Sequence, residues 1–342
     1  MNLYIALAVA AGLSFLIAFL LGFVIIPWLR KLKFGQTILD IGPVWHKSKQ
    51  GTPNMGGFMF IISTIISVIC VLLTDYLLGG NLFAGDGIMP NQHKVKLVGG
   101  MLLAIGFGLI GFADDYIKVV KKRNLGLTVI QKTVAQLAVI FAYLAGLYFN
   151  GLTFMKIPFV GAVDLKWFFW FFGFCVIYGA VNAVNFTDGI DGLCASVTSI
   201  TAIAFCIAAL MSKFLGISVM AAALAGGCLG YLIWNYYPSK VIMGDTGSMF
   251  LGGMVVALAY AIDCPLILVL FGIIYVIEAL SDVIQIGYFK ATHGKRIFKM
   301  APIHHHFEMS GWKERKIVTV FSLVNIVGCL VGLVLYWYGV AA

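Results

Sequence analysis

The sequence contains little charge: Asp, Glu, Lys and Arg make up 11% of its 342 residues, and only 14 residues are acidic. Hydrophobic residues make up 61%, whereas a soluble domain has about 25% charged and about 45–50% apolar residues. This composition excludes a soluble globular protein. Because the apolar residues form repeated runs long enough to cross a bilayer, we expect an all-α polytopic membrane protein.

Cysteine is also scarce and lacks a metal-binding pattern. The seven cysteines are scattered, mostly inside apolar runs, and no Cys-x-x-Cys pair is present, which argues against a zinc site and a disulfide framework. No basic segment is interleaved with aromatic residues, so the net charge of +9 does not indicate nucleic-acid binding. Since repeats and linkers are absent too, residues 1–342 read as one membrane domain.

Ten apolar segments are predicted to span the membrane. Most of the 23 Lys and Arg residues follow the odd-numbered segments, so the positive-inside rule places those loops in the cytoplasm and both termini outside. The first segment has no basic run before it and no small-residue cleavage site, which indicates a retained helix. Residues 153–164 are expected to form a small outward-facing β-hairpin. The segments are 3–28, 56–78, 97–113, 128–149, 166–184, 193–212, 217–235, 247–263, 265–288 and 317–339.

Several polar clusters fall at the predicted cytoplasmic ends of these segments. Asp114 and Asp115 follow the third segment, and Lys118 and Lys122 lie four residues apart on one helical face beyond them. Such lysines can hold phosphate near the carboxylates. A solvated helix end is the alternative interpretation of the acid pair.

The loop after the fifth segment carries Asn185, Asp188 and Asp191 at three-residue steps, with two Asp-Gly pairs. Glycine permits tight turns and the close approach of a ligand, and the three side chains can present oxygen atoms together. A turn with helix-capping aspartates would explain one of these residues but not all three.

Asn235 ends the seventh segment, and Asp245 and Ser248 begin the eighth. Free backbone N–H groups at a helix start favour anionic ligands, and a carboxylate there can help to hold Mg²⁺. An N-cap aspartate is the alternative for Asp245.

Three consecutive histidines, His304 to His306, lie in the loop after the ninth segment. Histidine there can contact phosphate, a uracil ring or a metal, although consecutive side chains point in different directions and are poorly placed to share one Zn²⁺. A solvated surface run is the alternative. In the ninth segment itself, Glu278 and Asp282 share one helical face, either as structural partners or as site residues.

The first cytoplasmic loop adds residues 46–57, in which glycines and Pro53 shape the approach to the second segment and Lys49 can meet an anionic headgroup. Taken with the other four clusters, this loop resembles the polyprenyl-phosphate N-acetylhexosamine-1-phosphate transferase superfamily over essentially the whole chain. The similarity is closest to the bacterial phospho-N-acetylmuramoyl-pentapeptide transferase branch, because that branch carries the histidine pattern of residues 301–308. Asn54 departs from the family pattern, which commonly has Thr there.

The resemblance implies transfer of phospho-MurNAc-pentapeptide from its UDP carrier to undecaprenyl phosphate at the cytoplasmic face of the bacterial inner membrane, forming lipid I and UMP with Mg²⁺ as cofactor. It also implies a homodimer in contact with membrane lipid and without nucleic acid. Catalytic roles are implied for Asp114, Asp115, Asp245 and His304, and metal ligands at Asp245 and Asp188. Substrate-binding roles are implied for Lys49, Lys118, Lys122, Asn185, Asp188, Asp191, Asn235, Ser248, His305 and His306.

Two chemical routes are open: direct attack by the lipid phosphate, or prior attack by a carboxylate such as Asp245 to form a phospho-enzyme. We expect direct attack, because a phosphate monoester is largely dianionic at neutral pH. The prenyl chain requires an apolar groove, which we expect near the ninth segment. The competing functions are transfer from UDP-N-acetylglucosamine and cation-coupled transport, although a transporter would place its acids at the midplane rather than at one edge.

Overall fold

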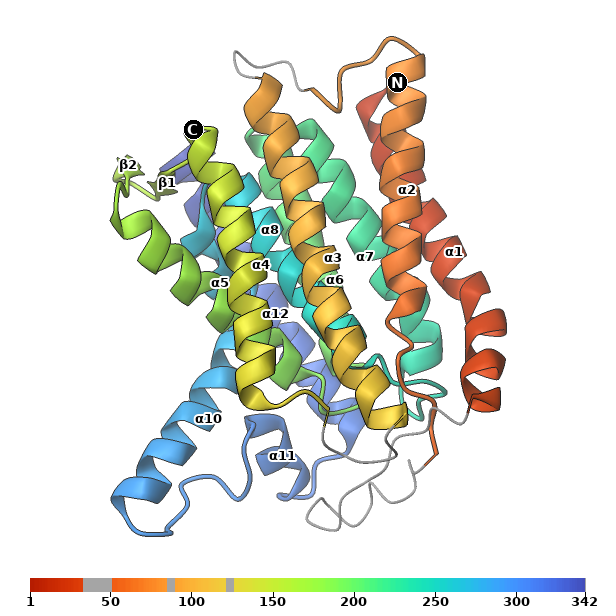
Figure 1. Cartoon of the computed structure of the whole chain (residues 1–342), viewed down its shortest axis with the longest axis vertical. Coiled ribbons are helices and arrows are strands. Elements are labelled where there is room, and N and C mark those ends of the chain that lie inside the picture. Colours follow the sequence, from red (N-terminus) through yellow and green to blue (C-terminus); the bar gives the residue numbers. More distant parts are fainter. Residues whose placement is uncertain (33–50, 85–89, 121–125, 342) are drawn as a thin grey trace.

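The computed structural model describes residues 1–32, 51–84, 90–120 and 126–341, and it is largely helical (Figure 1). A short 3₁₀ turn, Pro265–Ile267, precedes α9, and a π-helical turn, Trp337–Ala341, follows α12. The main elements are α1 (Leu3–Lys31), α2 (Phe58–Leu77), α3 (Pro90–Val120), α4 (Val129–Phe149), β1 (Phe154–Ile157), β2 (Gly161–Asp164), α5 (Phe168–Thr187), α6 (Leu193–Met211), α7 (Leu215–Asn235), α8 (Gly244–Ala261), α9 (Leu268–Phe271), α10 (Ile273–Ala291), α11 (Ile303–Glu308) and α12 (Glu314–Tyr336).

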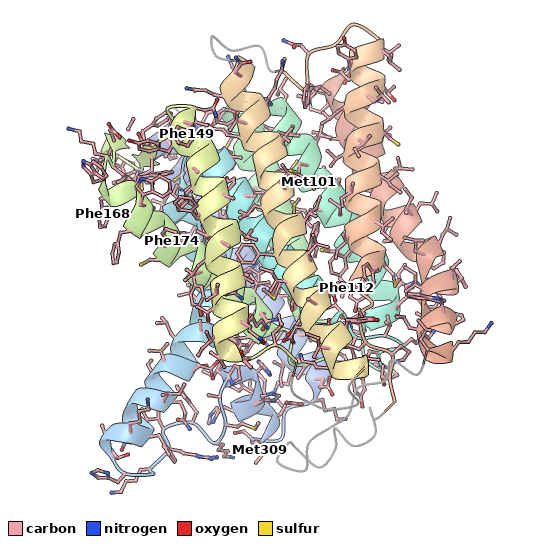
Figure 2. The ribbon with its side chains drawn as sticks, viewed as in Figure 1. Met101, Phe112, Phe149, Phe168, Phe174 and Met309 are labelled. Carbon is pink, nitrogen blue, oxygen red and sulfur yellow. The ribbon has the colours of Figure 1, made fainter. Side chains whose placement is uncertain are left out.

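The predicted helical membrane protein is confirmed. Within the described residues, eight helices are long and apolar enough to cross a membrane, or nine if one bent pair counts as a single span. Apolar side chains such as Phe149 and Phe168 project outward from the bundle, as expected for surfaces that lipid covers (Figure 2). The predicted segment 247–263 corresponds to α8, an 18-residue helix whose first turn contains Gly244, Asp245 and Gly247 and which is not among the membrane-length apolar helices.

The ninth predicted segment is helical, but it is broken rather than straight. Residues 265–271 and 273–291 form two helical pieces that meet at an angle of 87°. The break falls at Gly272, whose φ of −120° and ψ of 38° lie outside the helical range. Hydropathy reports the length of an apolar run but not its direction. The bend sends α10 away from the bundle toward the end of the molecule where α11 lies (Figure 1).

The core of the bundle is α8, which lies against α3 over much of its length. All residues of α8 from Thr246 to Ala261 are buried. Glycine permits the close approach of the two helices: a Cβ on Gly111 of α3 would lie 2.0 Å from the Asp245 carbonyl oxygen, and one on Gly253 of α8 would lie 2.7 Å from Ala104 Cα. The C-terminal part of α3 is therefore held directly against the N-terminal turn of α8.

The predicted hairpin is confirmed. Strands β1 and β2 pair antiparallel, with Phe154 opposite Asp164 and Ile157 opposite Gly161. The hairpin and both ends of the chain lie at one end of the bundle, while α11 and the C-terminal end of α3 lie at the other (Figure 1). This arrangement agrees with an even number of crossings; the assignment of each end to one side of the membrane stays a prediction.

Candidate active site

Three carboxylates from two helices converge at the end of the bundle opposite the termini. Asp114 and Asp115 belong to the C-terminal part of α3, and Asp245 belongs to the first turn of α8. One carboxylate oxygen from each lies within 4.8 Å of the others. Asp114 and Asp115 are buried, and Asp245 is partly exposed. The close packing of Gly111 against Asp245 explains why residues far apart in sequence meet here.

Asp115 is fixed by groups that also fix the start of α8. Its Oδ2 accepts hydrogen bonds from the backbone N–H of Thr246 at 2.9 Å and from the Thr246 hydroxyl at 2.7 Å. Its Oδ1 accepts a hydrogen bond from the Asn54 amide at 3.2 Å. Gly244 has a φ of +71°, and a Cβ there would lie 2.6 Å from Asp115 Oδ2. Only glycine therefore fits this turn without strain, and the turn positions Asp115 under α8.

Two lysine ammonium groups offset part of the negative charge of the three carboxylates. Lys118 Nζ is ion-paired with Asp114 and lies 3.9 Å from Asp115 Oδ1 and 3.2 Å from Asp245 Oδ2. Lys132 Nζ, from α4, lies 2.9 Å from the same Asp245 oxygen. Burial alone would raise the pKa of Asp245, but the two lysines outweigh burial and hold that pKa well below its usual range. Asp245 is therefore ionised and lies beside two lysine ammonium groups.

Asn185, predicted to lie in the loop after the fifth segment, lies in the last turn of α5 and joins the cluster from there. Its amide donates to Asp245 Oδ1 at 3.1 Å and to Ser248 Oγ at 2.8 Å. Both Asp245 oxygens thus have partners: Oδ1 accepts from Asn185, while Oδ2 accepts from the two lysines. The structure brings the predicted residues Asn185, Ser248 and Asp245 together in one network.

Asp191 and Asn235 hold neighbouring loops together. Asp191 Oδ2 accepts from the Ser239 backbone N–H at 3.0 Å, and its own N–H donates to Glu314 Oε2 at 3.1 Å. The Asn235 side chain accepts from Gly192 N–H and donates to the Val241 carbonyl, both at 3.0 Å. These contacts show a positioning role for both residues, and their predicted contacts with substrate stay predictions.

Asp188 belongs to the same loop but is not part of the three-carboxylate group among the described residues. It lies at the C-terminal end of α5, where its backbone N–H donates to the Asn185 carbonyl at 3.2 Å. Its role as a metal ligand stays a prediction. Lys49 and Lys122 lie outside the described residues, so their predicted roles stay predictions as well.

The three histidines form the short helix α11, and their side chains point to different partners. His304 is fully buried, and its Nδ1 lies 3.0 Å from Glu278 Oε2 on α10. His305 Nδ1 lies 2.6 Å from Glu308 Oε2, and His306 Nδ1 accepts the Lys299 backbone N–H at 3.1 Å. The three Nδ1 atoms therefore have three different partners.

Two residues of this site were not predicted as site residues. Neither was singled out in the sequence, yet Lys132 contacts Asp245 and Thr246 fixes Asp115. A local signal for Lys132 exists, because Thr128 and Gln131 form a capping box that starts α4 and places Lys132 in its first turn. Glu278, for which both interpretations were open, is a structural partner of His304.

The donor set of the cluster fits a divalent metal ion. Three carboxylates supply the oxygen ligands that Mg²⁺ prefers. A cation already lies among them, because the Lys118 ammonium is ion-paired with each of the three carboxylates. Lys118 is one-third exposed on a flexible side chain, so it can move aside for a metal ion and its anionic ligand.

Comparisons with known proteins cover almost the whole chain. The family model for "Glycosyl transferase family 4" matches residues 97–263, which include all three carboxylates. A protein of Desulforamulus reducens named phospho-N-acetylmuramoyl-pentapeptide-transferase is 44% identical over 335 residues, covering 96% of both chains. A protein of the same name from Acetivibrio thermocellus is 47% identical over 324 residues, covering 94% of this chain and 92% of the relative. One from Halalkalibacterium halodurans is 42% identical over 325 residues, covering 94% and 95%.

Proposed function

The chain belongs to the phospho-N-acetylmuramoyl-pentapeptide transferases of glycosyl transferase family 4, and from this we propose the reaction that it catalyses. The enzyme transfers phospho-MurNAc-pentapeptide from UDP-MurNAc-pentapeptide to undecaprenyl phosphate. The products are lipid I and UMP. We place the reaction at the cytoplasmic face of the bacterial inner membrane, where the basic loops are expected.

The observation that carries this proposal is the cluster of Asp114, Asp115 and Asp245 with Lys118 and Lys132 at one end of the bundle. The reaction exchanges one phosphoanhydride for another, so it needs alignment and charge neutralisation more than an energy source. Three carboxylates can hold Mg²⁺, and two ammonium groups can hold phosphate oxygens. Because the cluster lies at one end of the helix bundle, a prenyl tail can remain in the hydrocarbon of the membrane while its phosphate reaches the site.

Asp114, Asp115 and Asp245 would hold the Mg²⁺ ion, with Asp188 as a further predicted ligand. Bound there, the ion would neutralise pyrophosphate oxygens and stabilise UMP as the leaving group. Lys118 and Lys132 exchange their carboxylate partners for phosphate oxygens when the donor binds. Lys118 comes from α3 and Lys132 from α4, and both ammonium groups meet at the same oxygen of Asp245.

We favour direct attack of the lipid phosphate on the sugar-linked phosphorus. The acceptor is largely dianionic at neutral pH and needs little base assistance. Asp245, the candidate for a covalent route, accepts a hydrogen bond from Asn185 and would also ligate Mg²⁺ when the donor binds, and both contacts would reduce its nucleophilicity. Asp114 or Asp115 aligns the acceptor and accepts any remaining proton. Phosphorylated Asp245, trapped with the nucleotide donor alone, would contradict this route.

The histidine segment and the loops supply the remaining proposed contacts. His304 is the proposed catalytic histidine, and His305 and His306 are proposed to contact the donor together with Asn235 and Asp191. The prenyl chain is proposed to lie along α10, whose face with Leu280, Val283 and Ile284 is exposed. A homodimer in the membrane is proposed from the family resemblance.

The test is UMP release by the purified protein in detergent, with Mg²⁺ and undecaprenyl phosphate, from either of two donors. Release from UDP-MurNAc-pentapeptide but not from UDP-N-acetylglucosamine supports the proposal. Release from UDP-N-acetylglucosamine alone would assign the protein a different donor, and release from neither would contradict the proposed reaction.

A further inference from the structure

A cavity lies where α11 leads into α12, at the end of the bundle that carries the candidate active site. Its volume is about 590 Å³, within the range of about 300–1,000 Å³ that is usual for ligand sites. Its lining includes the last residue of α11, and α11 lies at the end of the molecule where α3 ends (Figure 1). Its main lining residues are Tyr237, Glu308, Trp312, Lys313, Glu314 and Arg315.

The two acidic side chains of this cavity are bound to the loops of the candidate site. Glu314 Oε2 accepts the backbone N–H of Asp191 at 3.1 Å, and Glu308 Oε2 lies 2.6 Å from His305 Nδ1. These bonds attach the cavity wall directly to two residues that are predicted to contact the donor.

The basic side chains are placed to receive an anion. Lys313 and Arg315 are exposed at the cavity. One N–H group of Arg315 donates to the Tyr237 carbonyl at 3.0 Å, and its guanidinium lies 5.6 Å from the centre of the Tyr237 ring. A guanidinium has five N–H donors, so this single bond orients Arg315 and leaves donors for a ligand.

The backbone of α12 also makes this side of the cavity positive. Lys313 is the N-cap of α12, a helix of 23 residues, and its side chain makes no capping hydrogen bond. The first N–H groups of a helix have no acceptor within the helix, and the helix dipole makes this end positive. The cap and the first two residues of α12 form part of the cavity lining, so the backbone and the two basic side chains favour a carboxylate there.

We infer that this cavity binds the free carboxylate at the end of the donor's peptide. The inference rests on the proposed function. A peptide joined to the muramoyl group through its amino end carries a carboxylate at its other end. Five extended residues span at most about 18 Å, so the peptide reaches beyond the reacting phosphates. Trp312 and Tyr237 give the cavity apolar walls for the peptide, and Lys313 and Arg315 bind its terminal charge.

The test compares two donors that differ at one group: UDP-MurNAc-pentapeptide with a free terminal carboxylate and the same donor with a terminal carboxamide. The KM of the wild-type protein is expected to be at least about tenfold lower for the acid, since a hydrogen bond to a charged group is worth about 1.5–3 kcal/mol. The variant Lys313→Gln is expected to reduce this ratio, and Lys313→Gln with Arg315→Gln is expected to abolish it. Because Lys313 is exposed, its replacement leaves the fold intact.

Lys295→Gln is the matched control, because Lys295 is exposed and does not line the cavity; it should retain the wild-type ratio. Equal KM values for the two donors with the wild-type protein would overturn the inference while leaving the proposed function in place. If the double variant keeps the wild-type ratio of the two KM values, the inference is also overturned and the proposed function stays in place. No UMP release from either donor with the wild-type protein would instead overturn the proposed function and the inference with it.

Discussion

The carboxylate of Glu278 lies 3.0 Å from His304 Nδ1, and both side chains are fully buried. This contact joins α10 to α11, so it links the bent helix to the histidine segment. A carboxylate acceptor places the imidazole proton on Nδ1 and leaves a lone pair on Nε2. Among the residues that the structure describes, Nε2 has no hydrogen-bond partner. It faces Gly189 in the loop that also carries Asp188, where a Cβ would lie 2.1 Å from it.

Replacing Gly189 with Ala is therefore expected to displace the His304 ring and lower kcat by about 10²-fold, since small misplacements of positioned groups cost about that much. UMP release by the purified variant measures this effect. Gly287→Ala is the matched control, because no atom lies within 4 Å of its added Cβ; it should retain wild-type activity. Wild-type activity in Gly189→Ala would show that the position of His304 does not matter for the reaction.

Gly111→Ala is expected to separate the carboxylates. Its Cβ would lie 2.0 Å from the Asp245 carbonyl oxygen, so α3 must move away from α8 and carry Asp114 and Asp115 with it. We expect a loss of activity of about 10²-fold or more, measured as UMP release at saturating donor. Gly146→Ala on α4 has open space around the added Cβ and should remain active. Equal activities of the two variants would contradict the close helix contact.

Lys132→Gln is expected to raise the KM for the nucleotide donor by about tenfold, because a charge-assisted contact to the donor phosphates is lost. Lys132→Arg keeps the charge and should recover part of this loss. Steady-state kinetics with the donor varied give both values. A change in the KM for undecaprenyl phosphate alone would assign Lys132 to the acceptor instead. Lys290→Gln, at the far end of α10, serves as the control.

The end of the bundle opposite the acid cluster contains a buried ion pair that tests the packing of α3 on α8. Lys96 Nζ lies 2.6 Å from Asp263 Oδ1, and both side chains are at most 8% exposed. Removing one partner leaves a buried charge, so Asp263→Leu should destabilise the protein by about 3–5 kcal/mol. The double variant Lys96→Met with Asp263→Leu should be markedly more stable than either single variant. Thermal denaturation in detergent measures this, and additive losses would contradict the coupling.

Much of this architecture could be predicted from the sequence, because a helix needs about 20 mostly apolar residues to cross the bilayer. The helices around α8 and the acid cluster of Asp114, Asp115 and Asp245 follow from hydropathy and from polar residues at the ends of apolar runs. The break at Gly272 could not be predicted this way, since a window of hydropathy is insensitive to a change of direction. The sequence offers no signal that separates Gly272 from other helical glycines.

The partners within the site were harder to predict than its members. Asp191 and Asn235 were expected to bind substrate, but their observed hydrogen bonds go to neighbouring loops. Lys132 contacts Asp245 from 113 residues away in sequence. Such contacts depend on how whole helices pack, and local spacing carries no information about them. Glycines such as Gly111, which set that packing, reveal their role only when the neighbouring backbone is known.

The most direct test of the central claim follows the phosphoryl group itself. The purified protein is incubated with Mg²⁺, undecaprenyl phosphate and UDP-MurNAc-pentapeptide labelled in the sugar-linked phosphate, and label is counted in the lipid and aqueous phases. The account predicts one label in lipid for each UMP released, and a loss of about 10²- to 10³-fold or more in Asp245→Asn. Label that stays in the aqueous phase, or transfer at the wild-type rate by Asp245→Asn, would contradict it.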